Sequence, residues 1–388
     1  MEGKLIYMDH GSTTAVEEEV VQTMQPWFAQ WYGNPSGVYE FADNSKKAVE
    51  HVREIIAESI GAKPEEIYFT AGGTEADNWI LKGMAFKDGA PKGRKHIITS
   101  AVEHHAVLHS CHFLEQMGCD VTYLPVDETG MIDVRELEQA IRPETVLISI
   151  MFANNEIGTI EPVREIGQIA QKYQIPFHTD AVQAYLHVPI QVKELGITAL
   201  SASSHKFNGP KGVGFLYLRE GTEVEPFLHG GAQEKRMRAG TENVPGIVGM
   251  GKAVELGMQY MEQDMGYVRE LRDYMLYQLF REIPDLCLNG SSTQRLPGNI
   301  NISLQSVEGA SLLVLLDMEG ICASAGSACS ARDSSPSHVL QAIGLPEDLI
   351  RGTIRFTLGP DNTREEVDTV VRHMKQFVLD LRGFTEES

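Results

Sequence analysis

Lys206 and Asp180 are the residues whose types and surroundings point most directly to chemistry. Lys206 lies within SASSHKFNGPKG (201–212), among small hydroxyl residues and glycines, and Asp180 lies upstream within HTDAVQ (178–183). A lysine in such surroundings can form an imine beside a bound phosphate, and an aspartate can keep a pyridine nitrogen protonated. The pair predicts pyridoxal phosphate (PLP), bound as a Schiff base to Lys206 with Asp180 at the ring nitrogen. Taken alone, the lysine would more often be a surface residue in a glycine turn, so the remaining motifs decide.

The composition of the chain narrows the classes of partner. The 388 residues are 42% hydrophobic and 22% charged, and 33 Lys and Arg against 54 Asp and Glu give a net charge of −21. Such a balance disfavours nucleic acids and anionic membrane surfaces, which reward clustered positive charge. No apolar leader is visible at the N-terminus, and the apolar runs are too short to span a bilayer. We therefore expect a cytoplasmic protein that binds neither nucleic acid nor membrane.

The cysteines indicate no disulfide framework. There are five, an odd number, and they are scattered along the chain with no Cys-x-x-Cys pair: Cys111, Cys119, Cys287, Cys322 and Cys329. Such spacing weakens a structural zinc or iron–sulfur interpretation.

Short apolar runs alternate with amphipathic segments through the middle of the chain. The pattern predicts helices over 106–117 and 164–173, and strands over 96–100, 120–126, 146–152, 176–179 and 213–218. This alternation is typical of an α/β fold with a mostly parallel central sheet and helices on both faces. Ligands gather at the carboxyl ends of strands in such sheets, and both Asp180 and Lys206 follow predicted strands.

The pattern changes after about residue 245. We expect a long amphipathic helix over 247–280, with 265–266 as the place where it could break. Strands over 299–304 and 353–358 and a final helix over 364–381 follow, and the tail 383–388 is expected to fray. The chain therefore divides into a large domain (15–250) and a smaller α+β domain (1–14 and 251–388).

An anion site is predicted where a strand ends, a glycine turn follows and a helix begins, in FTAGGTEA (69–76). Free N–H groups at the helix start, near Gly73, together with the Thr74 hydroxyl could hold a phosphate. An ordinary helix N-cap with glycines in the turn would explain the same residues equally well. A P-loop is excluded because the Gly-Lys-Ser/Thr motif is absent.

Histidines follow the strand that ends near residue 100. An imidazole at His104 could lie flat on a cofactor ring. His105, His109 and His112 share one helical face, but no further ligand at suitable spacing supports a metal there, so a solvated face is favoured and no metal is predicted.

Three further side chains could handle a substrate. Asn155, at the end of another predicted strand, would pair with a cofactor oxygen or a substrate carboxylate, a task that Gln183 could share. Arg355 lies mid-strand in apolar surroundings, where a buried guanidinium needs a bidentate anion such as an α-carboxylate. Cys329 lies in a small, polar, glycine-bearing segment, so we expect an accessible thiol that could act as a nucleophile or sulfur acceptor; an incidental loop thiol is the alternative.

Taken together, these motifs resemble the cysteine desulfurases of the class V aminotransferase superfamily, the NifS/IscS-like group, over essentially the whole chain. Each motif is weak alone, and their joint order and spacing are specific. The matching stretches are YMD (7–9), TT (13–14), GNPS (33–36), TAGGTEADN (70–78), EH (103–104), NNEIG (154–158), HTDAVQA (178–184), SSHKFNGPKGVG (203–214), HGGAQE (229–234), RAGTEN (238–243), GSAC (326–329) and RFTLG (355–359).

The resemblance implies a fold-type-I PLP homodimer with its active site at the subunit interface, and it implies a role for each matching residue. Lys206 binds the cofactor covalently and later serves as base, and Cys329, on a long loop of about 324–336, accepts the sulfur. The ring contacts are Asp180 at the nitrogen, His104 stacked on the face and Gln183 near the phenolic oxygen. The phosphate contacts are Gly73, Thr74, Ser203, His205 and, from the other subunit, Thr241. The substrate contacts are Asn34, Asn155 and Arg355.

The implied activity is conversion of L-cysteine to L-alanine with a persulfide on Cys329, which passes sulfur to an acceptor protein such as an iron–sulfur scaffold or to a thio-cofactor or tRNA pathway. A selenocysteine lyase, an ordinary class V aminotransferase and a non-catalytic scaffold remain alternatives. The chain departs from the family at 10–12, where it has His-Gly-Ser in place of the common Asn-Asn/Ala-Ala, and at 37–39, where it has Gly-Val-Tyr in place of Ser-x-His. These departures concern the pocket entrance and therefore substrate preference.

Overall fold

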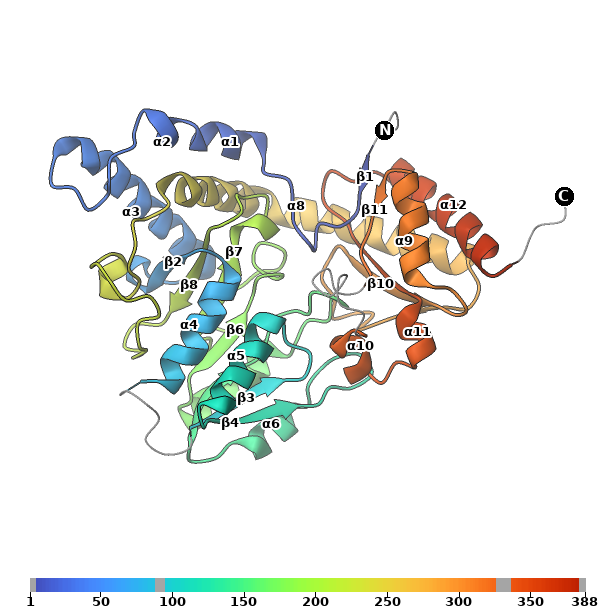
Figure 1. The fold of residues 1–388 in the computed structure, drawn as a ribbon, viewed down its shortest axis with the longest axis horizontal. Coiled ribbons are helices and arrows are strands. Elements are labelled where there is room, and N and C mark those ends of the chain that lie inside the picture. The colour runs from blue at the N-terminus through green and yellow to red at the C-terminus, as the bar shows by residue number, and fades with distance from the viewer. Residues whose placement is uncertain (1–4, 88–94, 326–335, 384–388) are drawn as a thin grey trace.

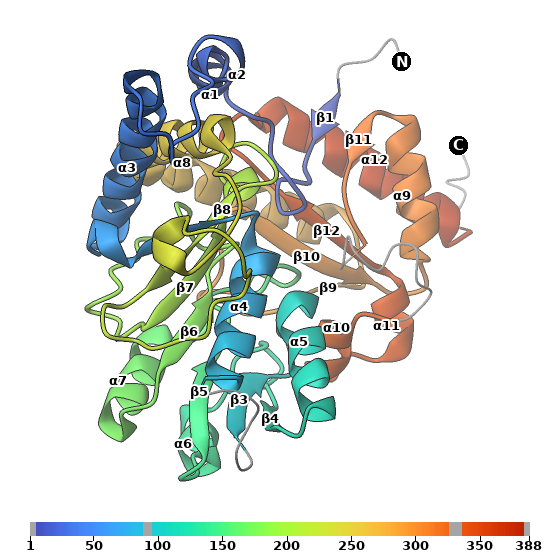
Figure 2. The same ribbon diagram turned by 60° about the vertical axis from the view of Figure 1, so that its left-hand side comes forward.

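A seven-stranded sheet forms the centre of the larger part of the molecule (Figures 1 and 2). The computed structural model describes residues 5–87, 95–325 and 336–383. The sheet has the order β2-β8-β7-β6-β5-β3-β4, in which β8 runs antiparallel to both neighbours and the other pairings are parallel. Its strands are β2 (Ile67–Thr70), β3 (His96–Ser100), β4 (Asp120–Leu124), β5 (Thr145–Ser149), β6 (Phe177–Asp180), β7 (Ala199–Ser203) and β8 (Gly214–Leu218). The mostly parallel sheet predicted from the sequence is confirmed.

Helices cover both faces of this sheet because successive strand residues are apolar on both sides. Ile98 packs into a core with α3, α7 and the first half of α8, whereas the adjacent Ile97 packs into a second core with α4 and α5. Continuous apolar strands of this kind are typical of sheets buried on both faces. The helices of this part are α1 (Glu18–Met24), α2 (Pro26–Ala29), α3 (Glu40–Ile60), α4 (Gly73–Ala85), α5 (His105–Gln116), α6 (Val134–Ala140), α7 (Val163–Tyr173) and α8 (Val244–Glu282).

A smaller α+β layer is built from the two ends of the chain (Figure 1). Its sheet has the order β12-β10-β9, and β1 pairs in parallel with β11 beside it. The strands are β1 (Ile6–Tyr7), β9 (Leu286–Leu288), β10 (Asn299–Leu304), β11 (Ile321–Cys322) and β12 (Thr353–Thr357), and the helices are α9 (Gly309–Met318), α10 (His338–Ala342), α11 (Glu347–Arg351) and α12 (Arg364–Leu381). The pairing of β1 with β11 carries residues 8–13, which follow β1, to the junction between the two sheets.

α8 joins the two parts, and it runs without interruption through the predicted break at 265–266. Its first half packs with α3 and its second half with β10 and α12, in separate cores. The break prediction is wrong because this packing holds both halves of the helix, while Gly266 is open to space and strains nothing. The predicted domain division at residue 250 stays a prediction, and it would fall inside this helix. Among the described residues, no helix is long and apolar enough to cross a membrane.

The remaining predicted elements agree with the structure to within a few residues. The sequence-based ranges omitted the helices α1, α2, α3, α6, α9, α10 and α11 and the strands β1, β7, β9 and β11. β7 is short and rich in Ala and Ser (ALSAS), so its sequence lacks the run of large apolar residues that indicates a buried strand. All five of its residues are nevertheless buried.

Candidate active site

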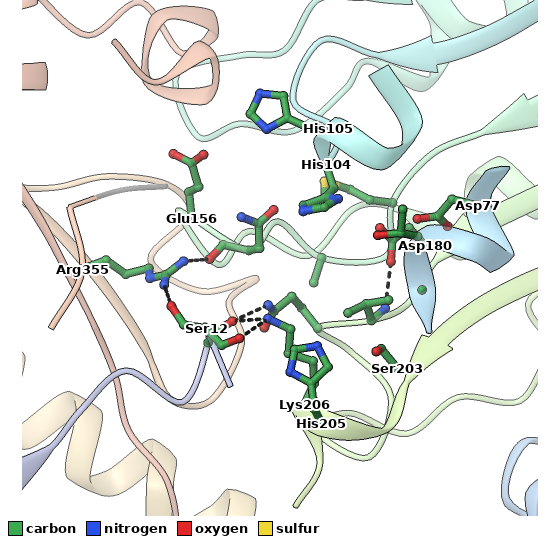
Figure 3. Close-up of a pocket in the computed structure, with 18 of the residues that line it drawn as sticks. Ser12, Asp77, His104, His105, Glu156, Asp180, Ser203, His205, Lys206 and Arg355 are labelled. Carbon is green, nitrogen blue, oxygen red and sulfur yellow. Dashed lines mark hydrogen bonds between the residues drawn. The ribbon is translucent and has the colours of Figure 1, made fainter. Parts of the chain in front are cut away.

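A cavity of about 280 Å³ lies where the carboxyl ends of β6 and β7 face the chain that follows β1 (Figure 3). Strands of a parallel sheet end at one edge, so the residues after them converge there. The lining residues come from both parts of the molecule: Gly11, Ser12, Gly73, Thr74, Asp77, His104, His105, Met151, Ala153, Asn155, Glu156, Asp180, Val182, Gln183, Ser203, His205, Lys206, His338 and Arg355.

Lys206 ends a short 3-10 turn, Ser204–Lys206, directly after β7. Its Nζ donates hydrogen bonds to the carbonyl oxygens of Gly11 at 2.6 Å and Ser12 at 2.9 Å. Two main-chain acceptors from the N-terminal segment therefore aim the amine into the cavity from a fixed direction.

Asp180 is the last residue of β6, and its carboxylate lies at the opposite end of the cavity from Arg355 (Figure 3). Burial raises the pKa of this carboxyl to about 6, although the hydrogen bond from Val182 N at 2.9 Å and the positive charge of Lys206 act in the other direction. A cation close to Asp180 would favour the ionised form of this carboxyl. The protonated nitrogen of a pyridine ring would be such a cation.

A buried polar network stands behind Asp180. His178 bonds the hydroxyl groups of Ser149 and Ser201 at 2.9 Å each, and the carboxylate of Asp77 lies 3.6 Å from His178 Nε2. Burial, and after it the neighbouring charge of Asp180, holds the pKa of Asp77 well above its usual range. Burial also lowers the pKa of His178 to about 3, so this imidazole is neutral at pH 7.

His104 is the N-cap of α5, where its Nδ1 accepts a hydrogen bond from Ala106 N at 3.1 Å. This bond fixes the imidazole in place above the cavity (Figure 3). Burial, with a smaller contribution from Lys206, lowers the pKa of His104 to about 4, so the ring is neutral at physiological pH. A neutral, fixed imidazole is suited to lie against an aromatic ring.

The wall next to the start of α4 can take a phosphate. α4 begins at Gly73, and Gly73 is packed so closely that an added Cβ would lie 2.4 Å from Val182 Cγ2. Thr74, Ser203 and His205 line the same wall, which opens into a second hollow on its outer side. Burial lowers the pKa of His205 to about 4, and its Nδ1 lies 3.1 Å from the Thr13 hydroxyl, which leaves a neutral ring whose Nε2 can donate.

Gln183 and Asn155 also line the cavity. Gln183 Nε2 donates to the carbonyl of Gly11 at 2.9 Å, the same oxygen that Lys206 bonds. The preceding Asn154 is fully buried and bonds main-chain groups of its own turn, so it fixes that turn and leaves the side chain of Asn155 at the cavity wall.

Arg355 lies in the middle of β12, as the sequence predicted, and its side chain is 2% exposed. Nη2 donates to Asp9 Oδ1 and to Ser12 Oγ, both at 2.9 Å, and Nη1 donates to the carbonyl of Asn155 at 2.8 Å (Figure 3). Nε is buried without a hydrogen-bond partner among the described residues. A buried guanidinium with a spare donor is suited to bind an anion.

Comparison with known proteins agrees with this arrangement. The model of the class V aminotransferases matches residues 6–370. This chain belongs to the class V aminotransferase family. Within it, the chain is 54% identical to the cysteine desulfurase IscS of Methanosarcina thermophila, covering 99% of this chain and 94% of the relative. It is 52% identical to the cysteine desulfurase IscS of Dictyoglomus turgidum, covering 97% and 95%.

Solved structures place the chain in the NifS/IscS-like group of this family. A NifS-like protein superimposes with a TM-score of 0.90 at 35% identity, covering 97% of this chain and 99% of that one. SspA in complex with cysteine superimposes with a TM-score of 0.81 at 38% identity, covering 92% and 100%. Members of the class V family are PLP-dependent, and the neighbours share the α/β fold described above.

Two predicted site residues of this family member, Asn34 and Thr241, do not line the cavity of their own chain. Asn34 is exposed, and its Oδ1 accepts from Ser36 N in its own turn. Thr241 is also exposed and lines neither the cavity nor the hollow beside it. Cys329 lies outside the described residues.

The structure adds cavity residues to which the sequence analysis gave no role: Ser12, Asp77, Glu156 and His338. Ser12 stood in a stretch that departs from the family, and Asp77 and Glu156 stood in matching stretches, so those were the available signals. His338 approaches His105 with 4.8 Å between ring centroids, and His109 lies 4.9 Å from His105. Among the described ranges, no cluster of three His, Cys, Asp or Glu could hold a metal ion.

Proposed function

We propose that this protein is a PLP-dependent L-cysteine desulfurase that converts L-cysteine to L-alanine and leaves the sulfur as a persulfide on Cys329. The observation that carries the proposal is one cavity that holds Lys206 between the carboxylate of Asp180 and the guanidinium of Arg355 (Figure 3). Relatives named cysteine desulfurase IscS, 48–54% identical over nearly the full length, support the substrate and the reaction.

The residues present fit PLP. Asp77 Oδ1 is a buried oxygen without a hydrogen-bond partner in the described part of the chain. It lies on the same wall as Asp180, whose buried carboxylate a cation would stabilise. The α4 start at Gly73 leaves no room for a side chain, so an anion can approach the main-chain N–H groups. When bound, PLP supplies an electron sink that stabilises negative charge at the substrate Cα.

Each wall of the cavity would hold one part of the cofactor. Asp180 would pair with the ring nitrogen, His104 would lie on the ring face, and Gln183 would approach the phenolic oxygen. The phosphate would lie against Gly73, Thr74, Ser203 and His205, with Thr241 of a second subunit added. The exposed position of Thr241, away from the cavity of its own chain, supports a role across a subunit interface.

Lys206 has the position of a general base. The carbonyl oxygens of Gly11 and Ser12 accept hydrogen bonds from its Nζ, which holds the amine beside a substrate bound between Asp180 and Arg355. In its neutral form Nζ takes the proton from the substrate Cα and returns a proton when alanine is formed. Arg355, with Asn155, holds the α-carboxylate during these transfers and so keeps Cα in reach.

Cys329 is proposed as the sulfur acceptor because described residues before and after it contact residues that line the cavity. Before it, Ser324 exchanges main-chain hydrogen bonds with Arg355 at 3.0 and 2.6 Å. After it, the Ser337 hydroxyl donates to Glu156 at 2.5 Å, and His338 lines the cavity. The thiolate of Cys329 attacks the substrate sulfur, the Cα-side fragment leaves with the electron pair of the C–S bond, and the new S–S bond keeps the sulfur on the protein.

We extend the proposal to a homodimer that delivers sulfur to an acceptor protein such as an iron–sulfur scaffold. Large exposed side chains from α2 to the start of α3 support a second subunit: Phe28, Trp31, Tyr32, Val38, Tyr39 and Phe41. Mixing a Lys206→Ala protein with a Thr241→Ala protein tests shared sites, since a mixed dimer regains one complete site. No regained activity would contradict a Thr241 contribution across the interface. The cytoplasmic location stays a prediction.

The decisive experiment measures alanine and sulfide from L-cysteine with a reductant, for wild type and Cys329→Ala in parallel. Equal amounts of both products, lost in the variant while the PLP absorption band remains, would support the proposal. Cys287→Ala is the matched control, because Cys287 bonds within the small sheet between β9 and β10 and should leave the rate unchanged.

Two other outcomes would redirect the assignment. A wild type with a PLP band but no sulfide would point to selenocysteine or to transamination. A Cys329→Ala protein that keeps full sulfide release would show that the nucleophile is wrong.

A further inference from the structure

Ser12 lies between the two residues that the proposed reaction depends on most. Its carbonyl oxygen accepts from Lys206 Nζ at 2.9 Å, and its Oγ accepts from Arg355 Nη2 at 2.9 Å. Its own N–H donates to the carbonyl of Asp9 at 2.9 Å, which fixes the turn. The side chain lines the cavity and is only partly buried, so it meets whatever binds beside Arg355 (Figure 3).

The hydrogen bonds around Arg355 leave one hydroxyl hydrogen unused. Nη2 gives its two hydrogens to Asp9 and Ser12, and Nη1 gives one to the carbonyl of Asn155. Ser12 Oγ accepts in this contact, so its own hydrogen remains to be donated. Among the described residues, no hydrogen bond has the Ser12 hydroxyl as its donor. An anion bound by Arg355 would lie next to this hydroxyl and could accept its hydrogen.

We infer that the Ser12 hydroxyl is a substrate-binding group that donates a hydrogen bond to the α-carboxylate of the amino acid held by Arg355. The inference rests on the proposed function and deepens it by naming a specificity-determining residue. Oγ is then polarised by Arg355 on its acceptor side, which strengthens the hydrogen bond it donates.

The inference is tested with Ser12→Ala, with Ser12→Thr as the variant that keeps the hydroxyl. Ser12→Ala removes a hydrogen bond to a charged group, so the KM for L-cysteine should rise on the order of 10-fold with kcat nearly unchanged. Ser12→Thr should stay near wild type. Ser59→Ala is the matched control, because the Ser59 hydroxyl bonds Ile56 and Tyr185 and does not line the cavity.

Binding without turnover gives the second measurement. The affinity for L-alanine, followed by the absorbance of the PLP-loaded protein, should fall about as much as the KM rises, whereas cysteamine, which lacks the carboxylate, should bind wild type and Ser12→Ala alike. This test stands even if the wild type makes no alanine from cysteine, an outcome that would refute the proposed function alone.

Three results would overturn the inference. One is an unchanged affinity for L-alanine in Ser12→Ala. Another is an equal loss of affinity for cysteamine. The third is a crystal structure of Ser12→Ala in which Arg355 has turned away from its wild-type position, because the hydroxyl would then act only by positioning the guanidinium.

Discussion

The two ends of the cavity differ in the sign of their buried charged groups: carboxyls lie at one end and a guanidinium lies at the other. At the end formed by the large sheet, Asp180 and Asp77 are both buried, and burial raises the pKa of each. At the end formed by β12, the guanidinium of Arg355 is buried beside Asp9 and still has a free Nε donor among the described residues. One end therefore favours a cation and the other an anion, which orients any ligand that carries both.

The difference between the two ends explains how a site in a very acidic chain can suit a ligand that carries both a cation and an anion. The net charge of −21 describes the whole surface, whereas the site separates one buried cation from one buried anion along a single cavity. Lys206 lies between them, and its amine donates hydrogen bonds to the carbonyl oxygens of Gly11 and Ser12.

The largest expected effect comes from the residue between the two ends. Lys206→Ala should lower kcat by about 10²–10⁴-fold or more, because the Cα proton loses its base. The measurement is single-turnover alanine formation, together with the loss of the PLP that borohydride reduction fixes to the wild-type chain before denaturation. Activity retained within 10-fold would mean that the two charged ends suffice and that another group moves the proton.

At the anionic end, Asp180→Asn should lower kcat on the order of 100-fold, because a neutral amide no longer stabilises a protonated ring nitrogen. Asp77→Asn is the matched comparison: burial holds the pKa of Asp77 well above its usual range and so disfavours its charged form, and the same exchange should cost far less. Steady-state kinetics and the PLP absorption band of both variants provide the measurement. Equal losses in the two variants would mean that the negative charge is shared between the two carboxyls.

At the cationic end, Arg355→Gln should raise the KM for L-cysteine by about 100-fold, since charge-assisted hydrogen bonds to the carboxylate contribute about 1.5–3 kcal/mol each. The rate at saturating substrate should fall less, because proton transfer at Lys206 is not touched directly. Initial rates over a wide range of L-cysteine concentration measure both parameters. A variant with normal KM and low kcat would move the carboxylate site elsewhere.

The smallest expected effect is a pH dependence of stability in the cofactor-free protein. Asp180 has a folded-state pKa of about 6, above its ordinary value of 3.8, so the folded protein keeps a proton that the unfolded chain has lost between pH 4 and 6. This stabilisation is present below pH 4 and is lost as the pH rises through 6.

Thermal unfolding of cofactor-free wild type and Asp180→Asn between pH 4.5 and 7.5 measures it, since the other titrating groups are common to both. Wild type should lose stability relative to the variant as the pH rises, and added PLP should remove that loss. A constant difference would show that Asp180 is ionised throughout.

The local chemistry of the site could be predicted from short stretches of sequence. Lys206 and Asp180 each follow a predicted strand, and Lys206 lies among small hydroxyl residues and glycines. Arg355 lies in an apolar strand, which predicts that its side chain is buried. The same holds for the regular elements: α12 carries both its apolar stripe and a capping box at Thr363 and Glu366 in its own letters. The local signal failed at 265–266, where packing of α8 on both sides outweighed a glycine.

By itself, the sequence determined the residue types of the site, the α/β class and the family, because each is recorded in periodicity, spacing or motif order. Tertiary structure alone decided which distant residues meet. Ser12 and Arg355 touch although they are 343 positions apart, because pairing of β1 with β11 delivers the N-terminal turn to the cavity. Asp77 came beside Asp180 through the packing of α4 on the sheet. Such contacts follow from how the elements pack, which no local pattern of residues records.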